Sequence, residues 1–230
     1  MPRLLIVNAD DLGYDPAIDR GILEAAREGI VTSTTCLAGH DGAERALAAA
    51  EAVPTLGIGL HVDLSRWPSL EEASAPSVEQ EIEAQLARFV SLARRAPTHL
   101  DFHKHLHRHG SVLQAAIAVA RRHALPVRAI DDAMRDALRR QQVATPGAFV
   151  GDTGPTAFWT VGKILAALES AGEGVTELMC HPGHLPEQVQ TSYGAQREAE
   201  LAALLDPRVL ARARMGDPRL VDFRAVTPEM

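Results

Sequence analysis

The chain has 230 residues, of which 46% are hydrophobic and 23% are charged, and its formal net charge is −7. This composition is typical of one globular domain, which we expect to span residues 1–230, and it excludes a disordered or fibrous protein. The acidic balance also disfavours nucleic acid as a partner, because nucleic-acid binding requires clustered lysine and arginine side chains that neutralise phosphates.

Six short apolar runs, each followed by polar residues or glycine, predict β-strands. In chain order they are residues 4–7, 31–37, 57–62, 98–102, 125–130 and 175–179. The run at 125–130 is the least regular of the six, because Pro126 interrupts its start and cannot donate a backbone hydrogen bond. The segment from Asp131 to Pro155 shows no clear pattern.

Helical patterns lie between most of these strands. Asp15 followed by Pro16 predicts the start of the first helix, and Gly29 predicts its end. Ser77 and Ser111 each precede a glutamine at the spacing of a capping box, which predicts two further helix starts. The predicted helices are, in chain order, the segments 15–29, 43–52, 77–95, a helix that begins near 111, and 156–171.

The alternation of strands and helices predicts an α/β protein. Repeated βα units predict parallel strands joined by right-handed crossovers, and enough such units curl into a barrel. No internal repeat or low-complexity tract divides the chain. We therefore expect a distorted or incomplete (β/α) TIM-like barrel, with an open doubly wound sheet as the alternative.

The two cysteines, Cys36 and Cys180, lie far apart in apolar runs, which is typical of free thiols in a reducing compartment. The apolar run that follows Arg3 is too short for the core of a signal peptide, and no later run approaches the length of a membrane span. The sequence therefore predicts a cytoplasmic protein that does not contact a membrane.

Metal-binding residue types stand at the ends of four predicted strands. Asp10 and Asp11 follow the first strand, His61 ends the third, His103 follows the fourth, and His181 follows the last. In (β/α) barrels the loops after the strands meet at one rim and form the active site. We therefore expect these side chains to lie close together.

Two imidazoles and one carboxylate form a ligand set for a divalent ion and leave coordination positions open. Zinc, manganese, iron, nickel or cobalt suits such a set, and magnesium suits a carboxylate site that retains water. A water bound to the ion has a lowered pKa and becomes a nucleophile, while a neighbouring carboxylate takes its proton. The adjacent carboxylates of Asp10 and Asp11 can divide these two roles.

Each of these residues also has a purely structural explanation. Two aspartates before glycine are common in turns, His61 fits a hydrogen-bonded core histidine, and His181 before proline fits the end of a strand. The five histidines from His99 to His109 fit a polar loop or a non-specific metal-binding tract as well as they fit ligands. The joint arrival of these residues at strand ends favours the metal site.

Five stretches of the chain follow the order of the motifs in a known family. They are LIVNADDLG at 5–13, GIVTSTT at 29–35, GIGLH at 57–61, PTHLDFHKHLH at 97–107 and ELMCHPG at 177–183. With these motifs the sequence resembles the YdjC-like (ChbG-type) carbohydrate deacetylases, which remove acetyl groups from N-acetylated sugars such as chitooligosaccharides. The resemblance spans residues 4–183.

The resemblance implies a distorted (β/α) barrel in which Asp11, His61 and His103 hold a divalent metal, with Mg²⁺ or Zn²⁺ as the expected ion. It places Asp10 as the catalytic base and His181 beside the leaving group, where it is the available catalytic acid. The implied partner is a small N-acetylated sugar. Members of the family are often homodimers, and the sequence leaves dimerisation open.

The chain departs from the motifs of the family close to the metal residues. Leu12 stands where phenylalanine is usual, Lys104 stands where glutamine or histidine is common, and the loop from Asp63 to Ser77 is short. These differences leave the preferred sugar open. We expect Lys104 to point to solvent rather than to add positive charge beside the metal, and Arg128 to pair with Asp10 and keep it ionised.

The sequence thus predicts a hydrolase that removes the acetyl group from an N-acetylated amino sugar, with metal-bound water as nucleophile and the metal stabilising the oxyanion. One rival is a barrel phosphoesterase or amidohydrolase, but such enzymes usually carry His-x-His on the first strand, and this chain lacks a basic cluster shaped for phosphate. Another rival is a non-catalytic sugar-binding or metal-storage protein, which has little use for the unligated base Asp10.

Overall fold

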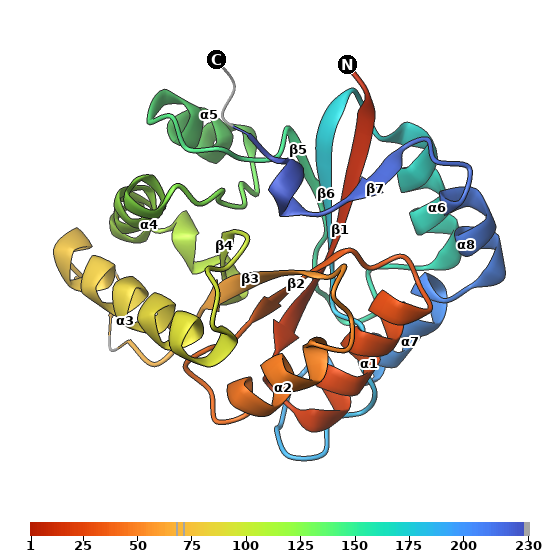
Figure 1. Ribbon diagram of the computed structural model, residues 1–230, viewed down its shortest axis with the longest axis horizontal. Helices are drawn as coiled ribbons and strands as arrows, with labels where there is room; N and C mark the ends of the chain where they lie inside the picture. Colours follow the sequence, from red (N-terminus) through yellow and green to blue (C-terminus); the bar gives the residue numbers. More distant parts are fainter. Residues whose placement is uncertain (68, 71, 228–230) are drawn as a thin grey trace.

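The computed structural model, in which residues 1–67, 69–70 and 72–227 are described, is a curled parallel sheet with helices outside it (Figure 1). The strand order is β4-β3-β2-β1-β6-β5, and β7 pairs with β1 outside this path. All the strand pairs are parallel. The strands are β1 Arg3–Leu12, β2 Ser33–Cys36, β3 Gly57–Val62, β4 Leu100–Phe102, β5 Ala148–Val150, β6 Gly174–Cys180 and β7 Arg219–Val221.

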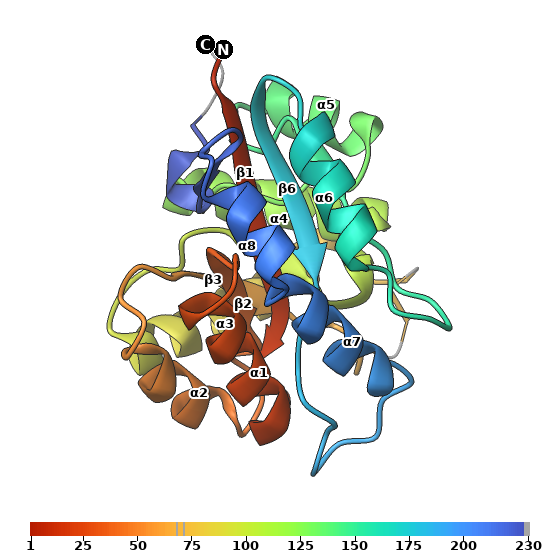
Figure 2. The same cartoon turned by 90° about the vertical axis from the view of Figure 1, so that its right-hand side faces the viewer.

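Helices cover the outer face of the curled sheet, as the two perpendicular views show (Figure 1, Figure 2). They are α1 Pro16–Arg27, α2 Ala43–Ala50, α3 Ala75–Ala93, α4 Gly110–His123, α5 Asp132–Arg140, α6 Val161–Ser170, α7 Ala195–Leu204 and α8 Pro207–Ala213, with 3-10 helices η1 His103–Arg108 and η2 Phe223–Ala225. The sheet path ends at β4 and β5 without joining them, so the expected incomplete (β/α) barrel is confirmed. Within the described ranges, no helix is both long and apolar enough to cross a membrane.

The strand predicted at residues 125–130 was wrong. This segment follows α4 in an extended conformation. It pairs with β4 at one isolated bridge, between Leu100 and Val127. Leu100 N donates to Pro126 O, and Arg128 N donates to Leu100 O, whereas Val127 N donates to Ala144 O on the other side. Because Pro126 lacks an N–H group, it cannot extend the ladder towards the start of the segment.

Helix boundaries follow capping chemistry, with small shifts from the prediction. The side chain of Asp15 caps α1 by accepting from Ala17 N, as expected. Helix α3 begins earlier than predicted, because Ser74 rather than Ser77 is its capping residue. The helix predicted at 156–171 begins only at Val161, and the segment without a clear pattern contains α5 and β5.

A bulge near the end of β1 positions the two adjacent aspartates. Ala9 pairs with Thr34 and Leu12 pairs with Cys36, so β1 uses one more residue than β2 over this interval. Asp11 has a φ of 78°, in the left-handed region that interrupts the regular alternation of a strand. Side chains of neighbouring strand residues normally point to opposite faces. The bulge allows Asp10 and Asp11 to approach the same histidine, His61.

Candidate metal-binding and catalytic site

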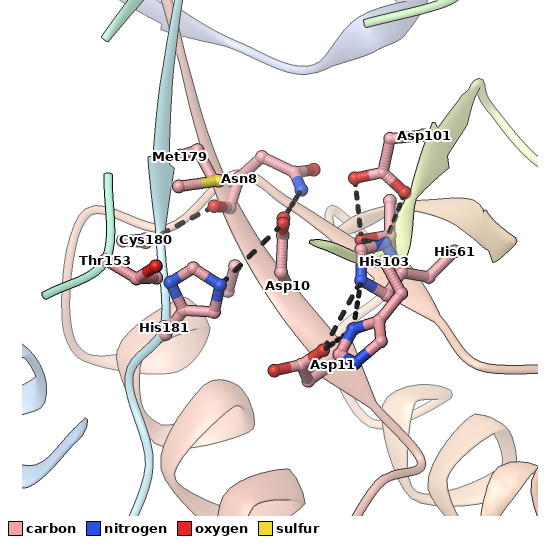
Figure 3. Close-up of polar contacts among 12 residues, drawn as sticks. Asn8, Asp10, Asp11, His61, Asp101, His103, Thr153, Met179, Cys180 and His181 are labelled. Atoms are coloured by element: carbon pink, nitrogen blue, oxygen red, sulfur yellow. Dashed lines mark hydrogen bonds and ion pairs between the residues drawn. The ribbon is translucent and has the colours of Figure 1, made fainter. Parts of the chain in front are cut away.

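Asp11, His61 and His103 come from three separate strand ends and meet at one point (Figure 3). Asp11 Oδ1 lies 3.3 Å from His61 Nε2 and 3.2 Å from His103 Nδ1, and the two nitrogens lie 3.3 Å apart. Atoms that bind one ion at about 2.0–2.2 Å, in tetrahedral or octahedral geometry, lie roughly 2.8–3.6 Å from one another. The three donor atoms therefore fit a single divalent ion.

The unsatisfied state of Asp11 Oδ1 is a second indication that the group suits a cation. Asp11 is 2% exposed, and its Oδ1 accepts no hydrogen bond from any described residue. A buried carboxylate oxygen without a partner is unfavourable, because desolvation is not compensated. Arg197 Nη2 donates to the other oxygen, Oδ2, at 2.5 Å. Burial alone would raise the pKa of Asp11, but the Arg197 guanidinium together with the imidazoles of His103 and His61 outweighs burial and holds this pKa well below its usual range.

Asp101 orients the ring of His61 for this role. His61 Nδ1 donates to Asp101 Oδ1 at 2.6 Å, and Thr35 Oγ1 donates to Asp101 Oδ2 at 3.1 Å. The other ring nitrogen of His61, Nε2, is then directed at Asp11 Oδ1. A carboxylate behind a histidine fixes the tautomer and the ring orientation of a metal ligand in this way. Sequence reasoning missed Asp101 because it treated only His103 of that motif as functional.

Asp10 lies beside the ligand group and is held by Arg128, as expected. Arg128 Nη1 and Nη2 donate to the two oxygens of Asp10 at 2.7 Å each, and Asn8 Nδ2 donates to Asp10 Oδ1 at 2.8 Å. Burial alone would raise the pKa of Asp10, but the Arg128 guanidinium outweighs burial and holds it well below its usual range. Asp10 is therefore an ionised carboxylate at neutral pH.

The buried guanidinium of Arg128 faces three carboxylates, which are those of Asp10, Asp101 and Glu177. The pKa of Glu177 is raised to about 7, mainly by burial. Repulsion from the carboxylates of Asp10 and Asp101 contributes to the rise in this pKa, whereas the attraction of Arg128 opposes the rise. A second group of metal-ligand atoms, from Asp10, His61 and Asp101, also lies within 4.8 Å. Because Arg128 already contacts both of its carboxylates, a cation there would be repelled, and the group containing Asp11 fits an ion better.

His181 lies on the opposite side of Asp10 from the ligand group (Figure 3). Its Nε2 is 4.0 Å from Asp10 Oδ2, and its Nδ1 has no hydrogen-bond partner among the described residues. The backbone N of His181 donates to Glu200 Oε2 at 2.7 Å, and its ring packs edge-on against Tyr193. Burial lowers the pKa of His181, so that the ring is neutral at neutral pH.

The remaining histidines of the run 99–109 do not join the group formed with Asp11. His99 stacks on Phe223 with 3.4 Å between ring centroids, and His107 is buried against Phe102. Both are structural residues of the core. Lys104 is exposed, so the expectation that it points to solvent is confirmed. His103 is therefore the one member of the run that contributes a ligand atom to that group within the described part of the chain.

Two residues that contact the site, Arg197 and Glu200, escaped sequence reasoning altogether. Both lie on α7, after the last recognised motif, and both are buried, at 2% and 0% exposure. The sequence carries only a weak signal for them. Arg197 and Glu200 stand at helical spacing from Leu201 and Leu204, so the four residues share the buried face of the helix. Charged residues on such a stripe are normally paired when buried.

Comparisons with known proteins agree with this architecture. The family described as YdjC-like protein matches residues 4–214. A carbohydrate deacetylase of Geobacillus stearothermophilus is 35% identical, with 97% of this chain and 98% of the relative covered. A chitooligosaccharide deacetylase of Serratia marcescens is 32% identical, with coverage of 92% and 94%. A crystal structure from Enterococcus faecalis V583, provisionally named a cellobiose-phosphate cleavage protein, has a TM-score of 0.85 at 29% identity and covers 98% and 99% of the two chains. The chain therefore belongs to the YdjC-like protein family.

Proposed function

We propose that the protein is a divalent-metal-dependent hydrolase that removes the acetyl group from an N-acetylated amino sugar. The observation that carries this proposal is the meeting of Asp11, His61 and His103 at donor distances beside the carboxylate of Asp10. The names of the two relatives, carbohydrate deacetylase and chitooligosaccharide deacetylase, support an acetylated sugar as the substrate class.

Asp11, His61 and His103 would hold the ion. Two imidazole nitrogens and one carboxylate oxygen favour Zn²⁺, and a carboxylate site with open water positions also admits Mg²⁺. When bound, the ion supplies a Lewis acid that polarises the acetyl carbonyl and lowers the pKa of the attacking water. Asp11 does not compete with Asp10 for the proton of that water, because Arg197 occupies its second oxygen.

Asp10 accepts the proton of the attacking water. Its two oxygens are fixed by Arg128 and Asn8, so the carboxylate is oriented before substrate arrives. The low pKa of Asp10 keeps it free of a proton over the neutral range, but it also makes Asp10 a weak base. Proton transfer to Asp10 therefore depends on the acidity of the water that it faces.

His181 delivers a proton to the departing amine. The ring is neutral at neutral pH, because burial lowers its pKa, so it must receive a proton before it can act as an acid. Asp10 Oδ2 lies 4.0 Å from His181 Nε2, and a small movement brings them into hydrogen-bond contact. The proton passes from water to Asp10, then to His181 Nε2, and then to the amide nitrogen as the C–N bond breaks. Acetate and the free amine of the sugar are the products.

The phosphoesterase rival receives no support from the charges around the site. Phosphate esters require cationic groups that face the transferred phosphoryl group. Both buried arginines described at this site are already paired, Arg128 with three carboxylates and Arg197 with Asp11. A non-catalytic sugar-binding or metal-storage protein would not need the oriented carboxylate of Asp10, because Asp10 is not a member of the group formed by Asp11, His61 and His103.

Acetate release from N-acetylated sugars tests the proposal. N,N'-diacetylchitobiose and longer chitooligosaccharides are incubated with the protein and Zn²⁺ or Mg²⁺, and acetate is measured by an enzyme-coupled assay. Chelation should abolish release and return of the metal should restore it. Turnover of 4-nitrophenyl phosphate without acetate from any N-acetylated sugar would favour the phosphoesterase.

Two conservative variants separate the roles of the adjacent aspartates. Asp11→Asn should reduce bound metal, measured by elemental analysis, because the amide removes the negative charge of the ligand. Asp10→Asn should retain the metal and lose roughly 100-fold or more in kcat, which is a usual effect of removing a general base. Equal loss of metal in both variants would contradict this division of roles.

A further inference from the structure

Helix α7 contacts both sides of the site through two buried side chains. It lies beside α1, close to the carboxyl end of β6 (Figure 2). Arg197 and Glu200 stand on its buried face, and each reaches a different proposed functional residue, Asp11 and His181 respectively. The contact with Asp11 joins positions 186 residues apart in sequence, and the contact with His181 joins positions 19 residues apart.

Arg197 determines which oxygen of Asp11 remains available. Its Nη2 donates to Asp11 Oδ2 at 2.5 Å, while Oδ1 faces His61 and His103 at 3.3 and 3.2 Å. A guanidinium that donates to one carboxylate oxygen competes with a cation for that oxygen and leaves the other oxygen better placed to bind an ion. Ligation by Asp11 is thereby directed to Oδ1, which is the oxygen that completes the triangle of donor atoms.

The polar contacts of the Arg197 side chain are concentrated on Asp11. Its Nε and Nη1 are buried and have no hydrogen-bond partner among the described residues, and within that part of the chain Asp11 is the one anion with which it forms an ion pair. Buried arginines that serve packing alone normally satisfy most of their donors, because unpaired polar groups are costly. Arg197 instead directs Nη2 at Asp11, while its Nε and Nη1 contact no hydrogen-bond acceptor among the described residues.

Glu200 acts on the opposite side of the site. Its Oε2 accepts from the backbone N of His181 at 2.7 Å, and its Oε1 accepts from the hydroxyl of Tyr193 at 2.6 Å. The ring of Tyr193 in turn packs against the ring of His181. One carboxylate therefore holds both the backbone of His181 and the aromatic side chain beside it.

We propose that α7 is a positioning element of the site, in which Arg197 makes Asp11 a one-oxygen metal ligand and Glu200 fixes the place of His181. The two side chains stand one helical turn apart, so the rigid helix sets the relation between the ligand side and the proton-donating side. This inference rests on the proposed metal site, and it predicts that the two variants fail in different measurements.

The experiment measures Zn²⁺ affinity by competition with a chromophoric chelator, and kcat and KM by acetate release. Arg197→Met should weaken Zn²⁺ binding by about 10- to 100-fold, the usual effect of removing a partner of a metal ligand, and Arg197→Lys should recover part of the loss. Glu200→Gln should keep Zn²⁺ affinity within about twofold of wild type but lower kcat by about 10-fold or more, with a smaller change in KM. Arg135→Met is the matched control, because Arg135 is a buried arginine of α5 that contacts Asp132 and the Pro146 carbonyl.

Wild-type Zn²⁺ affinity in a folded Arg197→Met variant would overturn the role of Arg197, and parallel loss of Zn²⁺ affinity in Glu200→Gln would overturn the division between the two sides. If neither Arg197→Met nor Arg197→Lys folds, as judged by circular dichroism, Arg197 is a residue of the fold and the inference fails. An equal loss in the Arg135→Met control would have the same meaning. Absence of Zn²⁺ binding by the wild-type chain would instead contradict the proposed metal site itself, and the inference with it.

Discussion

Replacement of Glu177 by glutamine should flatten the pH dependence of stability between about pH 4.5 and pH 7. Glu177 is fully buried on β6, and its Oε1 accepts from Arg128 Nε at 2.7 Å. Its other oxygen, Oε2, has no partner among the described residues. Burial and the neighbouring carboxylates raise its pKa to about 7, whereas an ordinary glutamate titrates near 4.5.

The sign of the effect follows from proton binding. Between these two pH values the folded chain holds a proton on Glu177 that the unfolded chain has lost, so the free energy of unfolding decreases as the pH rises. Each pH unit corresponds to about 1.4 kcal/mol, so the difference between 4.5 and about 7 amounts to roughly 3 kcal/mol. This contribution is fully present below pH 4.5 and is lost once the pH has passed about 7.

The glutamine variant lacks this titration. Its amide places N–H groups where Oε2 lacks a partner, which costs about 1–3 kcal/mol, but that cost is the same at every pH. The slope of the stability profile, rather than its height, is therefore diagnostic.

Urea unfolding of the chelator-treated protein, repeated from pH 4.5 to pH 8, gives the two profiles. Glu173→Gln is the control, because Glu173 directly precedes β6 and is largely exposed, with 72% of its side chain accessible. The difference between wild type and Glu177→Gln should change by roughly 3 kcal/mol across this range, whereas the control should run parallel to wild type. Parallel profiles for wild type and Glu177→Gln would refute the reasoning.

Three further substitutions test other contacts. Asp101→Asn should weaken Zn²⁺ binding by about 10- to 100-fold in a chelator competition, because His61 loses the charged partner that orients its ring; unchanged affinity would show that this partner is dispensable. Gly59→Ala should lower the free energy of unfolding in urea by about 1–3 kcal/mol, because the added Cβ would lie 2.4 to 2.8 Å from ring atoms of His99. Wild-type stability of this variant would mean that the ring moves freely. Arg128→Met should lower the free energy of unfolding by roughly 3–5 kcal/mol at neutral pH, because three buried carboxylates lose their cation. The loss should be smaller in acid, where these carboxylates take up protons, and thermal unfolding at two pH values would measure the difference. An equal loss at both pH values would contradict the assignment to charge.

Sequence alone could predict the grouping of the three proposed ligand residues, because each one lies in a short motif at or just after the carboxyl end of a strand. Strand ends of a parallel sheet meet at one rim, so Asp11, His61 and His103 could be brought together without knowing any crossing angle. The pairing of Arg128 with Asp10 was predicted from the position of Arg128 near the end of a predicted strand. The pairing is present, although the segment around Arg128 forms only an isolated bridge and not a strand.

The partners that hold these residues could not be predicted, because they depend on tertiary packing. The contact between Arg197 and Asp11 joins positions 186 residues apart in sequence, and no local pattern on α7 specifies it. The start of α4 was shifted for a related reason. His109 rather than Ser111 precedes its first residue, because the chain leaves η1 directly into the helix and Ser111 lies within its first turn.

The bulge in β1 has a practical meaning for anyone who wishes to transplant this chemistry to another scaffold. Two consecutive aspartates copied into a regular strand would point in opposite directions, one into the barrel and one towards the covering helices. The donor unit is therefore the backbone irregularity together with its two side chains, including the left-handed residue at Asp11. A design that copies only the sequence letters would carry the base or the ligand, but not both.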